Sequence, residues 1–247
     1  MKKCISIVML IMMLVLIFAG CGKETGVSRQ ETPASSSSKN DISSVQSVAS
    51  EEAPAGLDPK YSRLLLVNPD NPLPSDFDST VKLKEVEAQY LNGDLKQVDE
   101  GMYPYLMALL KAARADGIEI YVRSPYRSYS IQQMLFKNKV DRVIKAGTPE
   151  SQAEAVAATA VARPGTSEHQ TGLAVDFNTA SSTFETMPAY KWLKENAEDY
   201  GFIMRYPADK EHITKIIYEP WHWRFVGINV AKEMNNLGVT LEEYLKK

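Results

Sequence analysis

Two short segments of the chain carry residues that could bind a metal ion and activate water. They are residues 167–176 (SEHQTGLAVD) and residues 219–224 (EPWHWR). Together they offer two imidazoles and a carboxylate as ligands, and Glu219 supplies a further carboxylate three residues before the last imidazole. A catalytic zinc takes three nitrogen or oxygen ligands and keeps a fourth position for water, whose pKa falls to about 7 on the metal. The two segments therefore outline a metallohydrolase site.

The supply of histidines leaves little choice of ligands. The chain contains three, His169, His212 and His222, and His212 lies in a polar stretch where we expect a solvated loop. Either motif alone could be structural, because a single histidine is more often a satisfied core or surface residue and Asp176 could cap a turn. Finding both motifs in one chain favours a metal site over these alternatives.

The elements that must position the first segment are a turn and a strand. Gly172 allows the backbone to turn after His169, and residues 173–177 (LAVDF) indicate a short buried strand that carries Asp176. A buried carboxylate must be paired, hydrogen-bonded or bound to metal. This strand is therefore expected to aim Asp176 at a partner.

The second segment also predicts a strand. Residues 218–226 are rich in aromatic and β-branched residues, and Pro220 favours a strand start. Glu219 and His222 would lie on opposite faces of a regular strand, so a shared site requires Glu219 to lie in a bend before it. Arg224 alternates with apolar residues, a pattern more typical of a structural ion pair than of substrate steering.

The remaining pattern predicts an α+β fold. We expect helices over residues 103–115, 129–146, 149–162, 188–200 and 228–237, and further strands over residues 118–122, 202–205 and 213–218. Helices come first and strands cluster later, which favours a mostly antiparallel sheet flanked by helices in a single domain.

The Ser-x-His-x6-Asp segment followed by Glu-x2-His closely resembles the zinc D-alanyl-D-alanine carboxypeptidases of the VanY type, with the related L,D-carboxypeptidases and VanX-type dipeptidases. The resemblance covers roughly residues 60 to 235. It implies that His169, Asp176 and His222 hold Zn²⁺ and that Glu219 is the catalytic base.

A third segment, residues 124–132 (SPYRSYSIQ), looks like the substrate-binding segment of that family. The resemblance implies that Arg127 holds the substrate carboxylate and supports the transition state. It also implies that Gln132 and Ser167 line the peptide site. For Tyr126 a packing role and a substrate contact are equally open.

The N-terminal residues predict export and lipid anchoring. Residues 1–20 carry two lysines followed by an apolar run, as a secretory signal peptide does. Residues 18–21 (FAGC) resemble a bacterial lipobox, so we expect a lipoprotein signal peptide over residues 1–20 and acylation of Cys21. The alternative is an ordinary signal peptide beside an incidental cysteine. The expected location is extracytoplasmic, anchored to the cell membrane.

Composition divides the rest of the chain. Residues 21–56 are rich in Ser, Glu and Pro and contain too few large apolar residues to fold, so we expect a disordered tether. Residues 57–247 would form the zinc carboxypeptidase domain. With Cys4 in the signal peptide, the second of two cysteines has no internal disulfide partner. A net charge of −3 without a basic patch argues against nucleic acid as a partner.

The sequence thus predicts a zinc carboxypeptidase that removes the C-terminal D-alanine from peptidoglycan stem peptides. D,D and L,D specificity stay unseparated, because both substrates end in D-alanine. One rival is an endopeptidase cutting inside the stem, which would need no carboxylate clamp. Another is a zinc-stabilised wall-binding module without catalysis, for which the spare carboxylate of Glu219 would have no use. No obligate protein partner is evident.

The lipobox interpretation predicts that Cys21→Ser leaves the precursor unlipidated and releases much of the protein from the membrane fraction, because the Ser-rich tether offers no second anchor. Radiolabelled palmitate incorporation and membrane fractionation measure this. Equal palmitate labelling of wild type and variant would contradict the interpretation.

Overall fold

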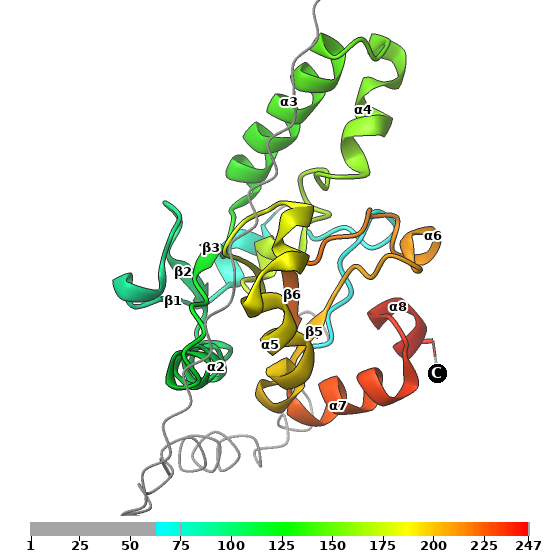
Figure 1. The fold of residues 1–247 in the computed structure, drawn as a ribbon. Coiled ribbons are helices and arrows are strands. Elements are labelled where there is room, and N and C mark those ends of the chain that lie inside the picture. The colour runs from blue at the N-terminus through cyan, green and yellow to red at the C-terminus, as the bar shows by residue number, and fades with distance from the viewer. Residues whose placement is uncertain (1–62, 75, 247) are drawn as a thin grey trace, which may run out of the picture. The chain divides into compact units, whose positions relative to one another are not determined.

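In the computed structural model of the chain, which describes residues 63–74 and 76–246, a four-stranded sheet brings the two predicted metal-binding segments together (Figure 1). Its strand order is β3-β4-β6-β5 and every pairing is antiparallel. The strands are β3 Val122–Ser124, β4 Ala174–Phe177, β5 Phe202–Met204 and β6 His222–Phe225. A second, two-stranded antiparallel sheet pairs β1 Leu83–Glu85 with β2 Gln97–Asp99. The predicted α+β fold with a mostly antiparallel sheet is confirmed.

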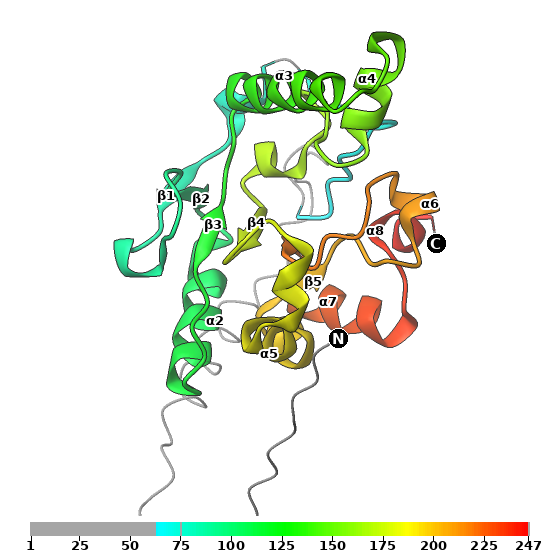
Figure 2. The same ribbon diagram turned by 45° about the horizontal axis from the view of Figure 1, so that its top comes forward.

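Helices surround the sheet (Figure 2). The α-helices are α2 Tyr103–Ala115, α3 Tyr129–Lys145, α4 Glu150–Ala158, α5 Pro188–Asn196, α6 Glu211–Thr214, α7 Ile228–Leu237 and α8 Leu241–Tyr244. Short 3-10 helices are η2 Phe77–Thr80, η3 Ala88–Tyr90, η4 Glu168–Thr171, η5 Ser182–Thr186 and η6 Ala197–Tyr200. The bounds predicted for α2 and α7 are confirmed. The helix predicted over residues 149–162 is shorter, and that over 188–200 divides into α5 and η6.

One face of the sheet packs on the main hydrophobic core. The alternation of the strands sends Val175 and Phe177 of β4, with Trp223 and Phe225 of β6, into this core. Apolar side chains of α2 and α5 cover them. Because side chains alternate along a strand, the residues between these apolar ones must point to the opposite face.

The opposite face carries the polar and ionisable residues of the same strands. Asp176 lies across from His222 in the β4 and β6 register, and Ala174 lies across from Arg224. All four residues are buried. A smaller apolar cluster under α7 and α8, which includes Ile203 of β5, packs beside this polar face. The sheet therefore separates the core from the site.

Two predicted strands differ from the structure. In the stretch predicted as strand 118–122, ladder pairing with β4 begins only at Val122, because the partner β4 ends at Phe177. Tyr121 instead donates its backbone N–H to the Asn178 side chain. The strand predicted over residues 213–218 is wrong. That stretch contains the end of α6, and Lys215 follows in the left-handed region at φ 63°, which breaks any extended run.

Gly172 makes the turn between η4 and β4 possible. Its φ of 73° lies in the left-handed region that favours glycine. A Cβ at this position would lie 2.8 Å from the backbone nitrogen of Asp99, whose N–H donates to the carbonyl of Gly172. Only glycine permits this close approach, which fixes His169 relative to Asp176.

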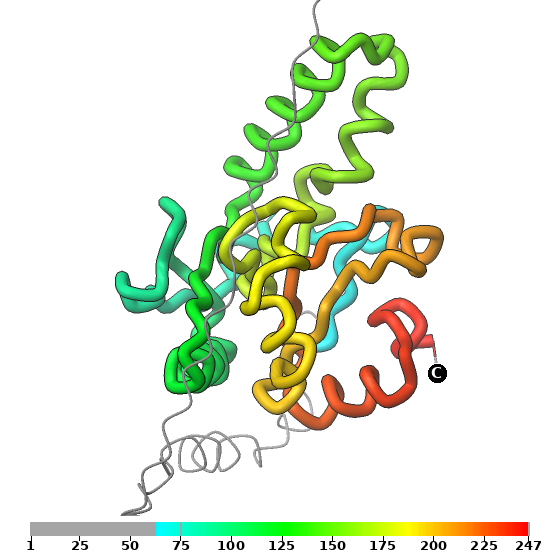
Figure 3. The backbone as a smooth tube through the Cα atoms, viewed as in Figure 1, coloured from blue at the N-terminus to red at the C-terminus, as the bar shows by residue number. Residues whose placement is uncertain are grey.

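Helices α3 and α4 pack against each other as a hairpin, whose backbone Figure 3 shows in green.

No helix within residues 63–246 combines the length and apolarity needed to cross a membrane. The predicted signal peptide, Cys21, the tether and the start of the predicted domain at residue 57 lie outside the described residues and stay predictions.

Candidate metal centre

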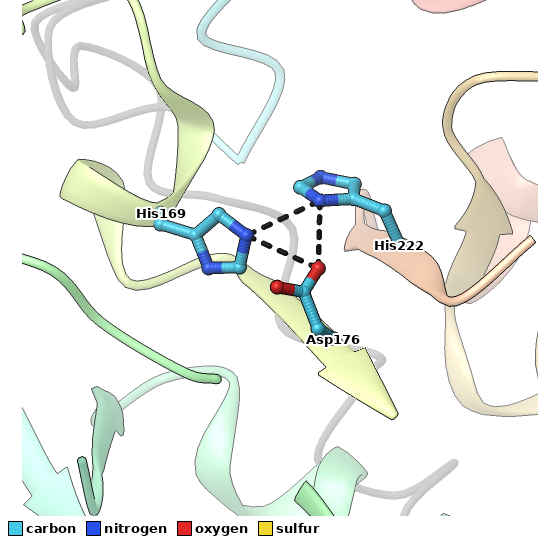
Figure 4. A group of neighbouring side chains, drawn as sticks. All are labelled: His169, Asp176 and His222. Atoms are coloured by element: carbon cyan, nitrogen blue, oxygen red, sulfur yellow. Dashed lines mark hydrogen bonds and ion pairs between the residues drawn. The ribbon is translucent and has the colours of Figure 1, made fainter. Parts of the chain in front are cut away.

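Three buried side chains, His169, Asp176 and His222, converge on the polar face of the sheet (Figure 4). Asp176 comes from β4, His222 from β6 and His169 from η4, which leads into β4. The Nε2 atom of His169 lies 3.2 Å from Nδ1 of His222 and 3.3 Å from Oδ1 of Asp176. The same Oδ1 lies 3.1 Å from Nδ1 of His222. Two nitrogens and one oxygen thus form a nearly equilateral triangle.

This triangle fits one tetrahedral metal ion. With metal–ligand bonds of about 2.0–2.1 Å, tetrahedral ligand atoms are about 3.3–3.4 Å apart. The observed separations of 3.1 to 3.3 Å are close to that spacing. The donor set of two imidazoles and one carboxylate is one that zinc accepts, and it leaves a fourth coordination position.

His169 is held ready to bind through Nε2. Its other ring nitrogen, Nδ1, donates to the carbonyl oxygen of Pro125 at 2.8 Å, which leaves the lone pair on Nε2. Burial, with the nearby charge of Arg127, lowers the pKa of His169 to about 4. This imidazole is therefore neutral at physiological pH, as a metal ligand must be.

His222 presents the opposite nitrogen, Nδ1. Burial disfavours its charged form, but the neighbouring carboxylates of Asp176 and Glu168 outweigh burial and raise the pKa of His222 to about 9 in the metal-free protein. Its Nδ1–H then donates to Asp176. Metal binding at Nδ1 must displace this proton.

Arg127 connects the segment 124–132 to the metal site. Its Nη2 donates to Oδ2 of Asp176 at 2.9 Å, so the two oxygens of Asp176 serve different partners. Its Nε donates to Ser124 at 2.9 Å and its Nη1 to Gln132 at 3.0 Å. The backbone N–H of Arg127 also donates to the carbonyl of His169. Arg127 is thereby held in one orientation.

The other residues predicted to bind substrate lie around Arg127 and η4. Gln132 is fully buried, and its side chain bridges Arg127 and the carbonyl oxygen of Ala162, so it orients the arginine. Ser167 is buried immediately before η4 but does not cap that helix through its side chain. Tyr126 is half-buried, and burial together with Asp78 raises its pKa to about 12.

Glu219 lies in the turn before β6, as a shared site requires. Its Oε2 is 3.8 Å from Nδ1 of His222, and within the described residues its carboxylate has no arginine or lysine partner. Burial, and then the charge of Asp176, raise the pKa of Glu219 to about 7 against the lowering effect of His222. Such a carboxylate can exchange a proton near neutral pH.

The structure also reveals a buried ionic cluster that the sequence patterns did not identify. Glu168 accepts from Arg205 at 2.7 Å and from Arg224 at 2.8 Å, and Arg205 pairs in turn with Glu242. The ion pair predicted for Arg224 is present. The available signal was two arginines in apolar stretches that were predicted as strands, because buried cations require buried anions. His212 is exposed within α6, not in a loop.

Comparisons with known proteins agree on one family. A family model described as VanY: D-alanyl-D-alanine carboxypeptidase matches residues 95–228. A D-alanyl-D-alanine carboxypeptidase of Enterococcus faecalis is 45% identical over 182 residues, which cover 74% of this chain and 65% of that protein. The putative carboxypeptidase YodJ of Bacillus subtilis is 36% identical over 233 residues, 91% of this chain and 80% of that protein. The chain thus spans just under two thirds of the enterococcal relative.

Solved structures show the same relationship. VanYB in complex with D-alanine-D-alanine aligns with a TM-score of 0.66 at 44% identity, over 75% of this chain and 98% of that one. A mutant of the vancomycin resistance D,D-pentapeptidase VanY in complex with Zn(II) gives 0.65 at 44% identity, over 75% and 99%. The LD-carboxypeptidase LdcB gives 0.61 at 35% identity, over 77% and 88%.

The ligand triangle predicts that the protein binds about one zinc ion per chain and that His169→Ala or His222→Ala sharply lowers this content, because two protein ligands make a poor site. His212→Ala is the matched control and should retain the metal, since its side chain is exposed and outside the site. Metal analysis after gel filtration measures all four proteins. Unchanged zinc in both site variants would remove the assignment.

Proposed function

Because the chain belongs to the VanY family of D-alanyl-D-alanine carboxypeptidases, we propose that it is a zinc-dependent carboxypeptidase that removes the C-terminal D-alanine from peptidoglycan stem peptides. The observation that carries the proposal is the triangle of three ligand atoms 3.1 to 3.3 Å apart, with the buried Glu219 carboxylate 3.8 Å from Nδ1 of His222. A wall-binding module would have no use for that carboxylate.

Zinc, when bound, supplies positive charge that polarises water and the substrate carbonyl. Glu219 is placed to accept a proton from the attacking water and to deliver it to the leaving amine. Burial raises the pKa of Glu219 in the metal-free protein, and a group whose pKa lies near the working pH can both accept a proton and release it. Asp176 and the two histidines fix where the reaction takes place.

Arg127 is placed to hold the carboxylate at the C-terminus of the substrate. Its guanidinium has five N–H donors, and the described contacts with Ser124, Gln132 and Asp176 use three. The two that are left belong to the terminal nitrogens, which can bind a carboxylate. A clamp for a terminal carboxylate favours an exopeptidase over an endopeptidase.

D,D specificity is the preferred form of the proposal. It is supported by the higher identity to VanYB, whose structure holds D-alanine-D-alanine, than to LdcB. The similarity to LdcB, an LD-carboxypeptidase, keeps cleavage of tetrapeptide stems as the second candidate. The two substrates differ in the residue before the terminal D-alanine.

We also propose that the protein acts outside the cytoplasm as a lipoprotein anchored through Cys21. The support is the apolar N-terminal run ending in FAGC and the Ser-rich stretch that follows. Such a tether would let an anchored enzyme reach the wall polymer. The expected partners are peptidoglycan stem peptides and the membrane.

The proposed activity predicts that the purified protein shortens a muramyl pentapeptide by one D-alanine and leaves a tetrapeptide largely intact. Glu219→Gln should retain zinc and lower the rate by roughly 10²- to 10⁴-fold, the usual contribution of a general base. Mass spectrometry of the products and metal analysis of both proteins give the answer. Cleavage of the tetrapeptide alone would establish L,D specificity, and a fully active Glu219→Gln would exclude the base role.

If Arg127 binds the substrate carboxylate, the loss of kcat/KM caused by Arg127→Ala and the loss caused by amidating the substrate should not add. Leaving the substrate carboxylate unpaired should cost on the order of 2 to 5 kcal/mol, which is roughly 30-fold to several thousand-fold in kcat/KM. Amidating the C-terminus of the substrate should therefore weaken wild type strongly and Arg127→Ala only slightly more.

Kinetics on the four combinations of enzyme and substrate measure this coupling. Arg123→Ala is the matched control, because Arg123 is an exposed arginine of β3, four residues before Arg127, whose Nη1 donates to the backbone carbonyl of Asn92. It should keep the full sensitivity to amidation. Additive losses, or normal cleavage of the amidated peptide by wild type, would assign Arg127 a structural role and favour the endopeptidase.

A further inference from the structure

A cluster of buried charges lies directly behind His222, on the side away from Asp176. Oε1 of Glu168 accepts from both Nε of Arg205, at 2.7 Å, and Nη1 of Arg224, at 2.8 Å. Arg205 also forms a bidentate pair with Glu242 at 2.8 and 2.6 Å. The side chains of Glu168 and both arginines are completely buried. Both arginines therefore hold the Glu168 carboxylate through the same oxygen.

The second oxygen of Glu168 is left facing His222. In the described part of the chain, four buried side-chain atoms have no hydrogen-bond partner, and two of them are Oε2 of Glu168 and Nε2 of His222. These two atoms lie 3.5 Å apart. A buried polar atom without a partner carries a desolvation cost, and here a potential acceptor faces a potential donor. Active-site hydrogen bonds of this length often tighten when the ligand binds.

The arrangement of the three metal ligands decides which ring nitrogen of His222 carries the proton. His222 turns Nδ1 toward His169 and Asp176, so binding a metal there requires the lone pair on Nδ1. The neutral imidazole must then carry its proton on Nε2, which points at Glu168. The Pro125 carbonyl plays the corresponding part for His169, whose ring binds through the opposite nitrogen.

We propose that Glu168 is a positioning residue, which accepts a hydrogen bond from Nε2–H of His222 and so holds this ring in the tautomer and orientation that bind metal through Nδ1. The inference deepens the proposed function, on which it rests, because it concerns the same zinc site. Arg205 and Arg224 fix the carboxylate, and Glu242 of α8 balances their charge from a position that does not touch a metal ligand.

Glu168→Gln separates this role from simple packing. Both arginines donate to one oxygen of Glu168, so the single oxygen of a glutamine should face them and its NH₂ group should face His222. An NH₂ group can only donate, so it would favour the tautomer with the proton on Nδ1, which cannot bind the metal. We expect zinc affinity to fall by about 10- to 100-fold, the usual effect of removing such an outer hydrogen bond.

The matched control is Glu242→Gln. Glu242 is also buried and paired with Arg205, so its loss disturbs the same cluster without touching His222. We expect this variant to lose stability but to keep wild-type zinc affinity. Zinc affinity is measured on the full chain by competition with a chelator, and folding of each variant by near-ultraviolet circular dichroism.

A direct readout of the tautomer comes from nitrogen NMR of the histidine-labelled full chain. The chain has only three histidines, so His169→Ala and His212→Ala assign the His222 signals. In zinc-loaded wild type we expect a proton on Nε2 of His222. In metal-free Glu168→Gln we expect the Nδ1–H form to be favoured. The wild-type measurement stands even if the Glu168→Gln protein fails to fold.

The outcomes distinguish failure of the proposed function from failure of the proposed role of Glu168. Wild type without zinc binding would overturn the proposed function together with its metal site. If wild type binds zinc, a proton on Nδ1 of metal-bound His222 would overturn the role of Glu168 alone. So would equal zinc affinity in wild type and folded Glu168→Gln, or an equal loss of affinity in Glu242→Gln.

Discussion

The pairing of Asp176 with His222 across β4 and β6 is the interaction on which the rest of the site depends. Residues directly opposite each other on antiparallel strands have neighbouring side chains on one face of the sheet. That pairing sends the alternate residues, Val175 and Trp223, into the core on the other face. A shift of the register by one residue would exchange the two faces, burying the metal ligands in the core and exposing the core to the site. The packing that stabilises the sheet therefore also fixes the metal ligands.

The second constraint is the balance of buried charge. The polar face holds four carboxylates, Asp176, Glu168, Glu219 and Glu242, beside three arginines. Each carboxylate except Glu219 has an arginine partner. In the metal-free protein a proton on His222 offsets the remaining negative charge, and its raised pKa reflects that. A divalent cation in the ligand triangle would supply this positive charge in place of the proton.

The same contacts connect groups for which different tasks are proposed. Asp176 uses one oxygen for the ligand triangle and the other for Arg127, so the metal and the proposed substrate clamp share a residue. Segments far from the site complete the cluster behind His222. Arg224 donates to the backbone carbonyls of Arg63 and Leu65, and Glu242 of α8 accepts from Asn68. The N-terminal and C-terminal ends of the described chain are thereby tied to the metal centre.

Where the backbone conformation depends mainly on neighbouring residues, it could be predicted from the sequence. The apolar periodicity of α2 and α7 ends near Gly117 and Gly238, both in the left-handed region, and their bounds were predicted correctly. The alternation of a strand was enough to require Glu219 in a bend before β6. The strand predicted over residues 213–218 was wrong, because Lys215 has a positive φ that interrupts an extended backbone.

What the sequence alone could not decide is which atoms of the predicted ligands act. The types and spacing of His169, Asp176 and His222 indicated a metal site, but the ring nitrogen that each histidine presents depends on what faces the other nitrogen. For His169 that partner is Pro125, 44 residues away, and for His222 it is Glu168, 54 positions earlier in the chain. Glu168 is in turn held by arginines 37 and 56 residues away. Local periodicity carries no information about such contacts, because buried charges choose partners by proximity in space, and only the tertiary structure sets that proximity.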